Sequence, residues 1–215
     1  MSFNWLADNY IEVFGAVTGI IYVFLEIRQD IWLWPVGIIT TSVYIWVFFT
    51  SKIYADMSLQ VYYLVISILG WYWWARKKER RKGEREKELL PEQDEVMNNG
   101  VNDKSLQVTR LKFNTGAVLA VVFSVIFAAI WLILSRYTDS PVPIRDSFVT
   151  SLSIVATWML ARKIYEHWLL WIIINFFSAV LFLTRGLYPT FILYIVYGVM
   201  SFAGLKEWKK SLMVN

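Results

Sequence analysis

Seven stretches of the sequence are apolar and close to the length that a bilayer-spanning helix requires. Such a helix needs about 20 mostly apolar residues. Taking charged residues as breakpoints predicts spans at 10–27, 31–50, 57–75, 113–137, 148–161, 168–184 and 186–205. Membrane β-barrels alternate apolar and polar residues along each strand, whereas 117–134 is almost continuously apolar. We therefore predict an all-α integral membrane protein with seven transmembrane helices.

The composition excludes several function classes. Hydrophobic residues make up 57% of the chain and charged residues 18%, against about 25% charged residues in soluble domains. A soluble chain of this kind would expose large apolar patches, so an ordinary cytosolic enzyme, a disordered regulator and a nucleic-acid-binding domain are excluded. There is no cysteine, no phosphate-binding glycine loop and no H-E-x-x-H motif. We expect no enzymatic activity, no metal site and no cofactor.

Basic residues indicate the orientation, because cytoplasmic loops carry an excess of Lys and Arg. With seven spans, 17 of the 21 basic residues fall on one side of the membrane. This bias predicts that the N-terminus is outside and the C-terminus is in the cytoplasm. No basic residue precedes Arg28, so the N-terminal stretch does not resemble a secretory signal.

Many of the basic residues lie in a hydrophilic segment between the third and fourth spans. We predict a charged cytoplasmic linker over 78–112, and its early part, 77–90, is suited to prolong the third helix. A solvated tether is the expected role. A site for anionic lipids or for a partner is the alternative, because basic clusters beside a span attract acidic head groups.

The sequence contains an internal repeat. Residues 10–77 align without a gap to residues 144–211, at an offset of 134 positions. Identical pairs include Arg28/Arg162, Trp34/Trp168, Tyr63/Tyr197, Gly70/Gly204 and Trp74/Trp208. We predict a 3+1+3 arrangement, with a first repeat (1–77), the linker, a linker helix (113–137) and a second repeat (144–211). The extra crossing makes the two repeats parallel, and parallel-repeat transporters bind substrate near the midplane between their halves.

Aromatic and polar residues follow helical stripes in both repeats, which is unlike a face that contacts lipid. We predict that these stripes line a substrate cavity. The expected substrate-binding residues are Asn175, Trp168, Trp171, Thr41, Tyr44, Gln60, Tyr63, Tyr194, Tyr197 and Trp158. The expected gate or rim residues are Trp34, Lys52, Asp56 and Tyr188. For Asn175 a hydrogen bond between helices remains an alternative to ligand contact.

Two further groups of residues have expected structural roles. Gly70 and Gly204 are expected to allow close packing of helices. The tryptophans near the cytoplasmic helix ends are expected to form an interfacial belt, since Trp is enriched at membrane surfaces. They are Trp71, Trp73, Trp74 and Trp208.

Several motifs together resemble a known family. In the first half they read WLWPVG at 32–37, KIYAD at 52–56 and GWYWW at 70–74. In the second half they read ARK at 161–163, EHW at 166–168 and GLYPT at 186–190, with Trp171 and Asn175 between. In this order the motifs resemble the PnuC-type nicotinamide riboside transporters, and the resemblance covers the chain except for the linker.

The resemblance implies a seven-helix vitamin transporter of the bacterial inner membrane with a SWEET-like parallel-repeat fold. It implies import of nicotinamide riboside by facilitated diffusion, phosphorylation of the substrate by a cytoplasmic ribosylnicotinamide kinase, and a homo-oligomer such as a trimer. Relatives of this fold transport thiamine or riboflavin, so a related vitamin such as thiamine is an alternative substrate. A seven-helix membrane receptor or scaffold is the alternative from a different class.

Overall fold

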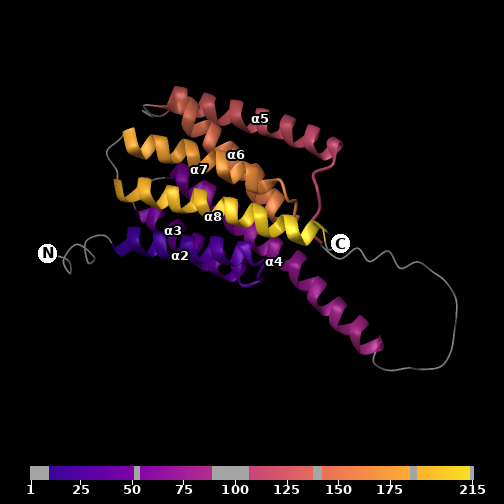
Figure 1. Ribbon diagram of the computed structural model, residues 1–215. Helices are drawn as coiled ribbons and strands as arrows, with labels where there is room; N and C mark the ends of the chain where they lie inside the picture. Colours follow the sequence, from indigo (N-terminus) through magenta and orange to yellow (C-terminus); the bar gives the residue numbers. More distant parts are fainter. Residues whose placement is uncertain (1–9, 51–53, 89–106, 138–141, 185–187, 214–215) are drawn as a thin grey trace.

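The computed structural model describes residues 10–50, 54–88, 107–137, 142–184 and 188–213. Figure 1 shows their helices: α2 (Tyr10–Ile27), α3 (Leu33–Thr50), α4 (Tyr54–Glu88), α5 (Phe113–Tyr137), α6 (Pro143–Ala161), α7 (His167–Thr184) and α8 (Tyr188–Met213). Within these ranges there is no β-strand, and one isolated parallel bridge pairs Thr109 with Ile164. The prediction of an all-α chain with seven helices is confirmed.

The helix ends differ from the predicted spans where charged residues were taken as breakpoints. α4 continues to Glu88, as the linker pattern suggested, and its C-terminal part projects from the bundle (Figure 1). α6 begins at Pro143, five residues before the predicted start. Proline fits the first turn of a helix, where its missing N–H is not needed. A charge can thus end an apolar span without ending the helix, because helical backbone satisfies its own hydrogen bonds in water too.

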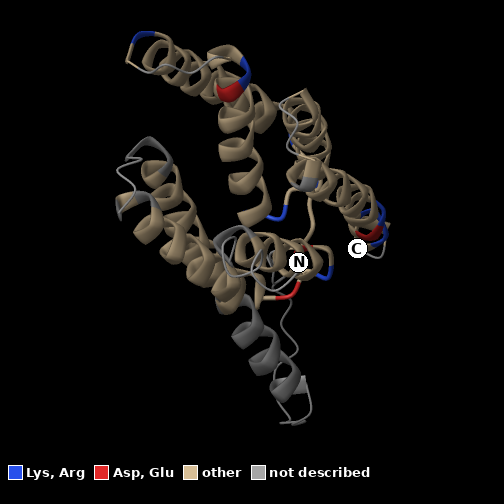
Figure 2. Ribbon diagram, turned by 90° about the vertical axis from the view of Figure 1, so that its left-hand side faces the viewer, with Lys and Arg blue, Asp and Glu red and all other residues tan. Residues whose placement is uncertain are grey.

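The helices pack in two groups, and two pairs of helices make the contacts between the groups. α3 packs on α2 and α4, and α7 packs on α6 and α8. The groups meet where α2 contacts α8 and where α4 contacts α6, while α5 packs against α6 alone among the described helices. Figure 2 shows that the charged residues of the described ranges lie at helix ends and in connections.

α5 stands out because its described residues include no buried one. Val118, Val121 and Val125 are all more than 60% exposed, which suits a helix whose sides face lipid. By length and apolarity, three helical segments of the described ranges qualify as membrane spans: Phe113–Tyr137, His167–Thr184 and Thr190–Met213.

α2 and α6, which begin the two aligned repeats, end in the same way. The residues just beyond them, Gln29 and Lys163, have φ of 53° and 54°. In each turn the following amide donates to the carbonyl five residues earlier over 2.9 Å. This left-handed residue with its backward hydrogen bond is a common helix C-terminal cap. The sequence repeat is thus also a repeat of local structure.

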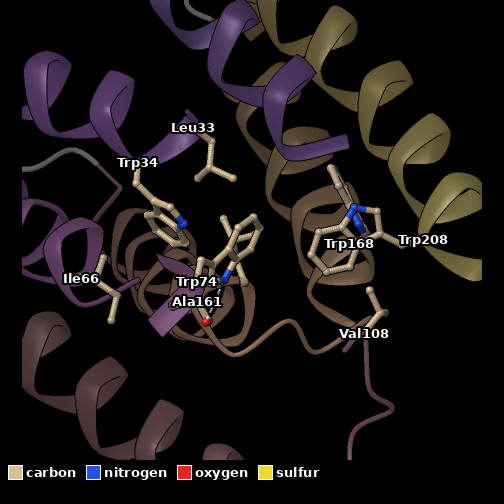
Figure 3. Packing of buried hydrophobic residues seen from close by; sticks show 9 residues of the cluster. Leu33, Trp34, Ile66, Trp74, Val108, Ala161, Trp168 and Trp208 are labelled. Atoms are coloured by element: carbon tan, nitrogen blue, oxygen red, sulfur yellow. Dashed lines mark hydrogen bonds between the residues drawn. The ribbon is translucent and has the colours of Figure 1, made fainter. Parts of the chain in front are cut away.

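Buried tryptophans pack in two pairs, Trp34 with Trp74 and Trp168 with Trp208, as Figure 3 shows. Trp74 Nε1 donates to the Ala161 carbonyl over 3.3 Å, and Trp208 Nε1 donates to the Glu26 carbonyl over 3.0 Å. Trp74 and Trp208 are 5% and 0% exposed. The expectation that these two belong to an interfacial belt is therefore wrong, because each indole N–H finds its partner inside the protein. Trp71, at 43% exposed, lies on the outside.

Gly70 and Gly204 are close-packing positions, as predicted. The ring of Trp34 lies on Gly70 and the ring of Trp168 lies on Gly204, and neither site has room for a Cβ atom. Both tryptophans are fully buried. The same glycine–tryptophan contact thus joins α3 to α4 and α7 to α8.

Candidate functional site

A cavity of about 330 Å³ lies between the two groups of helices. This volume is within the range of small-molecule pockets, about 300–1,000 Å³. Every described helix except α5 contributes to its lining. We call it the central cavity, and its lining residues are Thr18, Gly19, Tyr22, Val23, Glu26, Gly37, Thr40, Thr41, Tyr63, Ser67, Val149, Ser153, Thr157, Trp168, Trp171, Ile174, Asn175, Ser178, Tyr194, Tyr197 and Ser201.

Most of the residues predicted to bind substrate come together in this cavity. The seven that line it are Asn175, Trp168, Trp171, Thr41, Tyr63, Tyr194 and Tyr197. Gln60, Tyr44 and Trp158 do not line it. The hydroxyl end of Tyr44 packs against Gly15 of α2, and Trp158 packs against the buried hydrophobic clusters.

The predicted gate or rim residues are not gathered at one place in the described structure. Trp34 is buried against Gly70 and does not line the central cavity. Tyr188 begins α8 and is 62% exposed. Lys52 and the side chain of Asp56 lie outside the part of the chain that the structure describes.

Asn175 combines the two roles that the sequence left open. It is 6% exposed and lines the cavity, and its Nδ2 donates to Ser201 Oγ of α8 over 3.1 Å. Ser201 Oγ in turn donates to the Tyr197 carbonyl over 2.8 Å. The amide is therefore held in place by a helix–helix hydrogen bond while it faces the space between the two groups.

Three buried polar atoms of the lining have no hydrogen-bond partner among the described residues. They are Trp168 Nε1, Trp171 Nε1 and Thr40 Oγ1. Leaving a buried donor unpaired costs about 1–3 kcal/mol. A ligand that brought acceptor oxygens within reach of these donors would remove this cost. Thr40 was not among the predicted site residues.

The tyrosines of the lining form aromatic walls. Tyr194 stacks on Phe182 with ring centroids 5.2 Å apart, and it meets Tyr197 edge to face at 5.9 Å. The end of the Tyr197 ring rests on Gly19 of α2. Faces of this kind can stack on a planar ring or lie over a cation.

Sequence reasoning missed the contribution of α2 and α6. Thr18, Tyr22 and Glu26 recur every four residues, and so do Val149, Ser153 and Thr157; all six line the cavity. Four-residue spacing places side chains on one helix face. This signal was available in the sequence, because five of these six residues are polar and lie within otherwise largely apolar helices.

Glu26 is the one acidic or basic residue among the cavity-lining side chains that the structure describes. It is 2% exposed and His167 is 0% exposed. The Glu26 Oε1 atom lies 3.0 Å from His167 Nε2. His167 begins α7, so this pair joins the last turn of α2 to the first turn of α7. The pair connects residues 141 positions apart, which local spacing cannot reveal.

Comparison with known proteins identifies relatives over nearly the whole chain. A family model described as nicotinamide mononucleotide transporter matches residues 9–210. The chain is 30% identical to the nicotinamide riboside transporter PnuC of Escherichia coli strain K12, over 94% of this chain and 86% of that protein. It is 22% identical to the riboflavin/roseoflavin transporter RibM of Streptomyces davaonensis, over 95% of this chain and 92% of that protein.

A solved structure also resembles this fold. The crystal structure of the vitamin B3 transporter PnuC superposes with a TM-score of 0.69, at 21% identity, and covers 98% of this chain and 85% of that chain. At this identity the likeness shows a shared fold.

Proposed function

Since the chain belongs to the PnuC family of nicotinamide riboside transporters, we propose that it carries nicotinamide riboside across the bacterial inner membrane through the central cavity. The observation that carries the proposal is the chemistry of the lining. Aromatic walls, an oriented amide and unpaired buried donors surround one space between two groups of helices.

Nicotinamide riboside offers a group for each of these features. Its planar cationic ring suits the faces of Tyr194, Tyr197 and the cavity tryptophans. Its carboxamide matches the amide of Asn175, since amides pair through a donor and an acceptor. Its ribose oxygens can accept hydrogen bonds from Trp168 Nε1, Trp171 Nε1 and the Thr40 hydroxyl, which have no partner in the described protein. Substrate contact is assigned to these residues on this complementarity.

The charge of the cavity lining favours binding of the riboside over binding of the mononucleotide. No Lys, Arg or His occurs among the described lining residues, and Glu26 contributes a carboxyl group. A phosphate is ordinarily bound by basic side chains or by the backbone N–H groups of a helix N-terminus. A ligand without a phosphate therefore fits this lining better.

We further propose that the chain consists of two parallel three-helix repeats, 1–77 and 144–211, joined by the 78–112 linker and the 113–137 helix. Two hydrogen bonds support this. The tryptophan near the end of the third helix of each repeat donates to a carbonyl in the last turn of the first helix of the other, Trp208 to Glu26 and Trp74 to Ala161. Equivalent helix ends thus meet at one end of the bundle. The distribution of basic residues supports an outer N-terminus and a cytoplasmic C-terminus.

Facilitated diffusion is the mechanism we propose, because a chain of intramembrane ionisable residues, as in proton pumps, is absent from the described lining. Diffusion of a cation stops at electrochemical equilibrium, which without a membrane potential means equal concentrations on the two sides. Phosphorylation by a cytoplasmic ribosylnicotinamide kinase would keep the riboside concentration low and hold the product inside. A homo-oligomer is proposed on family resemblance alone.

The test is uptake of labelled nicotinamide riboside into proteoliposomes that contain the purified protein. With the membrane potential held at zero, we expect saturable uptake that ends at equal concentrations and does not depend on proton or sodium gradients. Enclosing a ribosylnicotinamide kinase and ATP should convert equilibration into accumulation. Riboflavin is the first competitor to include, because RibM is a relative, and thiamine is the second. Protein-dependent uptake of thiamine without uptake of the riboside would transfer the assignment to that vitamin. Tight binding without passage would indicate a receptor.

A further inference from the structure

Glu26 and His167 share a proton at the edge of the central cavity. His167 Nδ1 lies 2.7 Å from the Ile164 carbonyl oxygen. A carbonyl oxygen only accepts, so Nδ1 carries a hydrogen. The 3.0 Å contact between Nε2 and Glu26 Oε1 then needs a second hydrogen between the two atoms. The pair is therefore either an imidazolium with a carboxylate or an imidazole with a carboxylic acid.

The two members of this pair do not face the cavity equally. Glu26 lines the cavity and His167 does not. His167 is fully buried behind it, in contact with the rings of Trp168 and Trp208 at centroid distances of 4.8 and 4.6 Å. In the ionised form of the pair, the negative end points toward a bound ligand and the positive end points away.

We propose that Glu26 determines the charge preference of the central cavity, so that a cationic nucleoside binds more tightly than a neutral one of the same shape. This inference rests on the proposed function. A cation in the cavity stabilises the carboxylate–imidazolium form, because the carboxylate is the nearer of the two charges. The carboxylate attracts the cationic ligand, and the more distant imidazolium offsets part of that attraction. At an effective dielectric constant near 20, we expect the cationic nucleoside to bind about fivefold more tightly than the neutral one.

Two nicotinamide ribosides make a suitable pair of probes. The oxidised form carries the positive ring, and the dihydro form has the same carboxamide and ribose on a neutral ring. The measurement is the binding affinity of each probe for the purified full-length protein in nanodiscs. The ratio of the two affinities reports the charge preference and cancels losses that affect both probes.

Two substitutions should lower this ratio. Glu26→Gln keeps a hydrogen-bonding side chain beside His167 and removes the carboxylate, so the ratio should fall about fivefold. His167→Gln keeps a donor toward Glu26 but removes the imidazolium that stabilises the carboxylate, so Glu26 should keep its proton and the ratio should fall here as well. Glu207→Gln is the matched control, because Glu207 is an exposed carboxylate of α8 that pairs with Lys210 over 2.8 Å, and its ratio should equal that of the unaltered protein.

Three results would overturn the inference. They are equal binding of both probes by the unaltered protein, an equal loss of both probes in Glu26→Gln, and an unchanged ratio in His167→Gln. If Glu26→Gln fails to fold, the unaltered protein and His167→Gln still decide the matter. Failure of the unaltered protein to bind either probe would instead overturn the proposed function.

Discussion

Gln29 and Lys163 occupy equivalent positions of the internal repeat, and they contact each other in the folded chain. Lys163 Nζ donates to Gln29 Oε1 over 3.3 Å. A residue can touch its own repeat equivalent only close to the axis that relates the repeats. The contact supports an axis that passes between the turns after α2 and α6. Inverted repeats would place these turns on opposite faces of the bilayer.

Replacing Asn175 should affect binding much more than folding. Asn175→Leu removes the amide from the cavity, and we expect nicotinamide riboside affinity to fall at least about tenfold. The stability cost should be only about 1 kcal/mol, because Ser201 keeps its bond to the Tyr197 carbonyl. Isothermal titration and thermal unfolding in detergent measure the two effects. Ser201→Ala removes the side chain that holds the amide but keeps the amide itself, so its affinity loss should be smaller than that of Asn175→Leu. Equal losses of binding and folded yield in Asn175→Leu would make its role structural.

The indole N–H of Trp171 should contribute to binding without contributing to stability. Trp171→Phe keeps an aromatic ring and removes a donor that has no partner among the described residues. We expect a melting temperature that changes little, because relief of the unpaired donor's cost offsets the packing that the smaller ring loses. We expect an affinity loss of about three- to tenfold, the value of one hydrogen bond. Trp34→Phe is the control, because its N–H is also unpaired but lies outside the cavity lining. A similar affinity loss in both variants would contradict the prediction.

Replacing either packing glycine by alanine should lower the stability of the protein, but only one of the two replacements should weaken ligand binding. Gly70→Ala and Gly204→Ala should each cost about 1–3 kcal/mol, the usual cost of overpacking. Only Gly204→Ala should also weaken binding, because the ring it displaces belongs to Trp168 of the lining, whereas Gly70 supports Trp34. Gly198→Ala, whose nearest neighbour beyond its own helix is 4.0 Å from the added Cβ, should be tolerated. Thermal unfolding and titration of the three variants provide the test.

The proposed orientation can be tested by labelling, because the chain has no cysteine of its own. Lys210→Cys places a thiol near the end of α8, and Arg136→Cys places one in the last turn of α5. A membrane-impermeant thiol reagent added to intact cells should label Arg136→Cys and leave Lys210→Cys unlabelled until the cells are opened. The reverse pattern would invert the proposed topology.

The sequence alone was sufficient for the helices, the repeat and seven of the residues that line the central cavity. Two predicted spans, 10–27 and 113–137, coincide with α2 and α5. Residues such as Thr41, Tyr63 and Asn175 were found because a repeated polar stripe within an apolar helix is informative on its own. Helical periodicity states which residues share a face, and the chain's motifs identify its family.

Only the tertiary structure decided which neighbour covers each face. Gln60 and Tyr44 share helical stripes with lining residues, yet they do not line the cavity, and Trp74 and Trp208 are buried where a belt was expected. The pairing of Glu26 with His167 arises because their side chains reach each other at the junction of the two groups, where α2 packs on α8, the neighbour of α7. Periodicity is a property of one helix, whereas burial and pairing depend on how helices distant in sequence pack together.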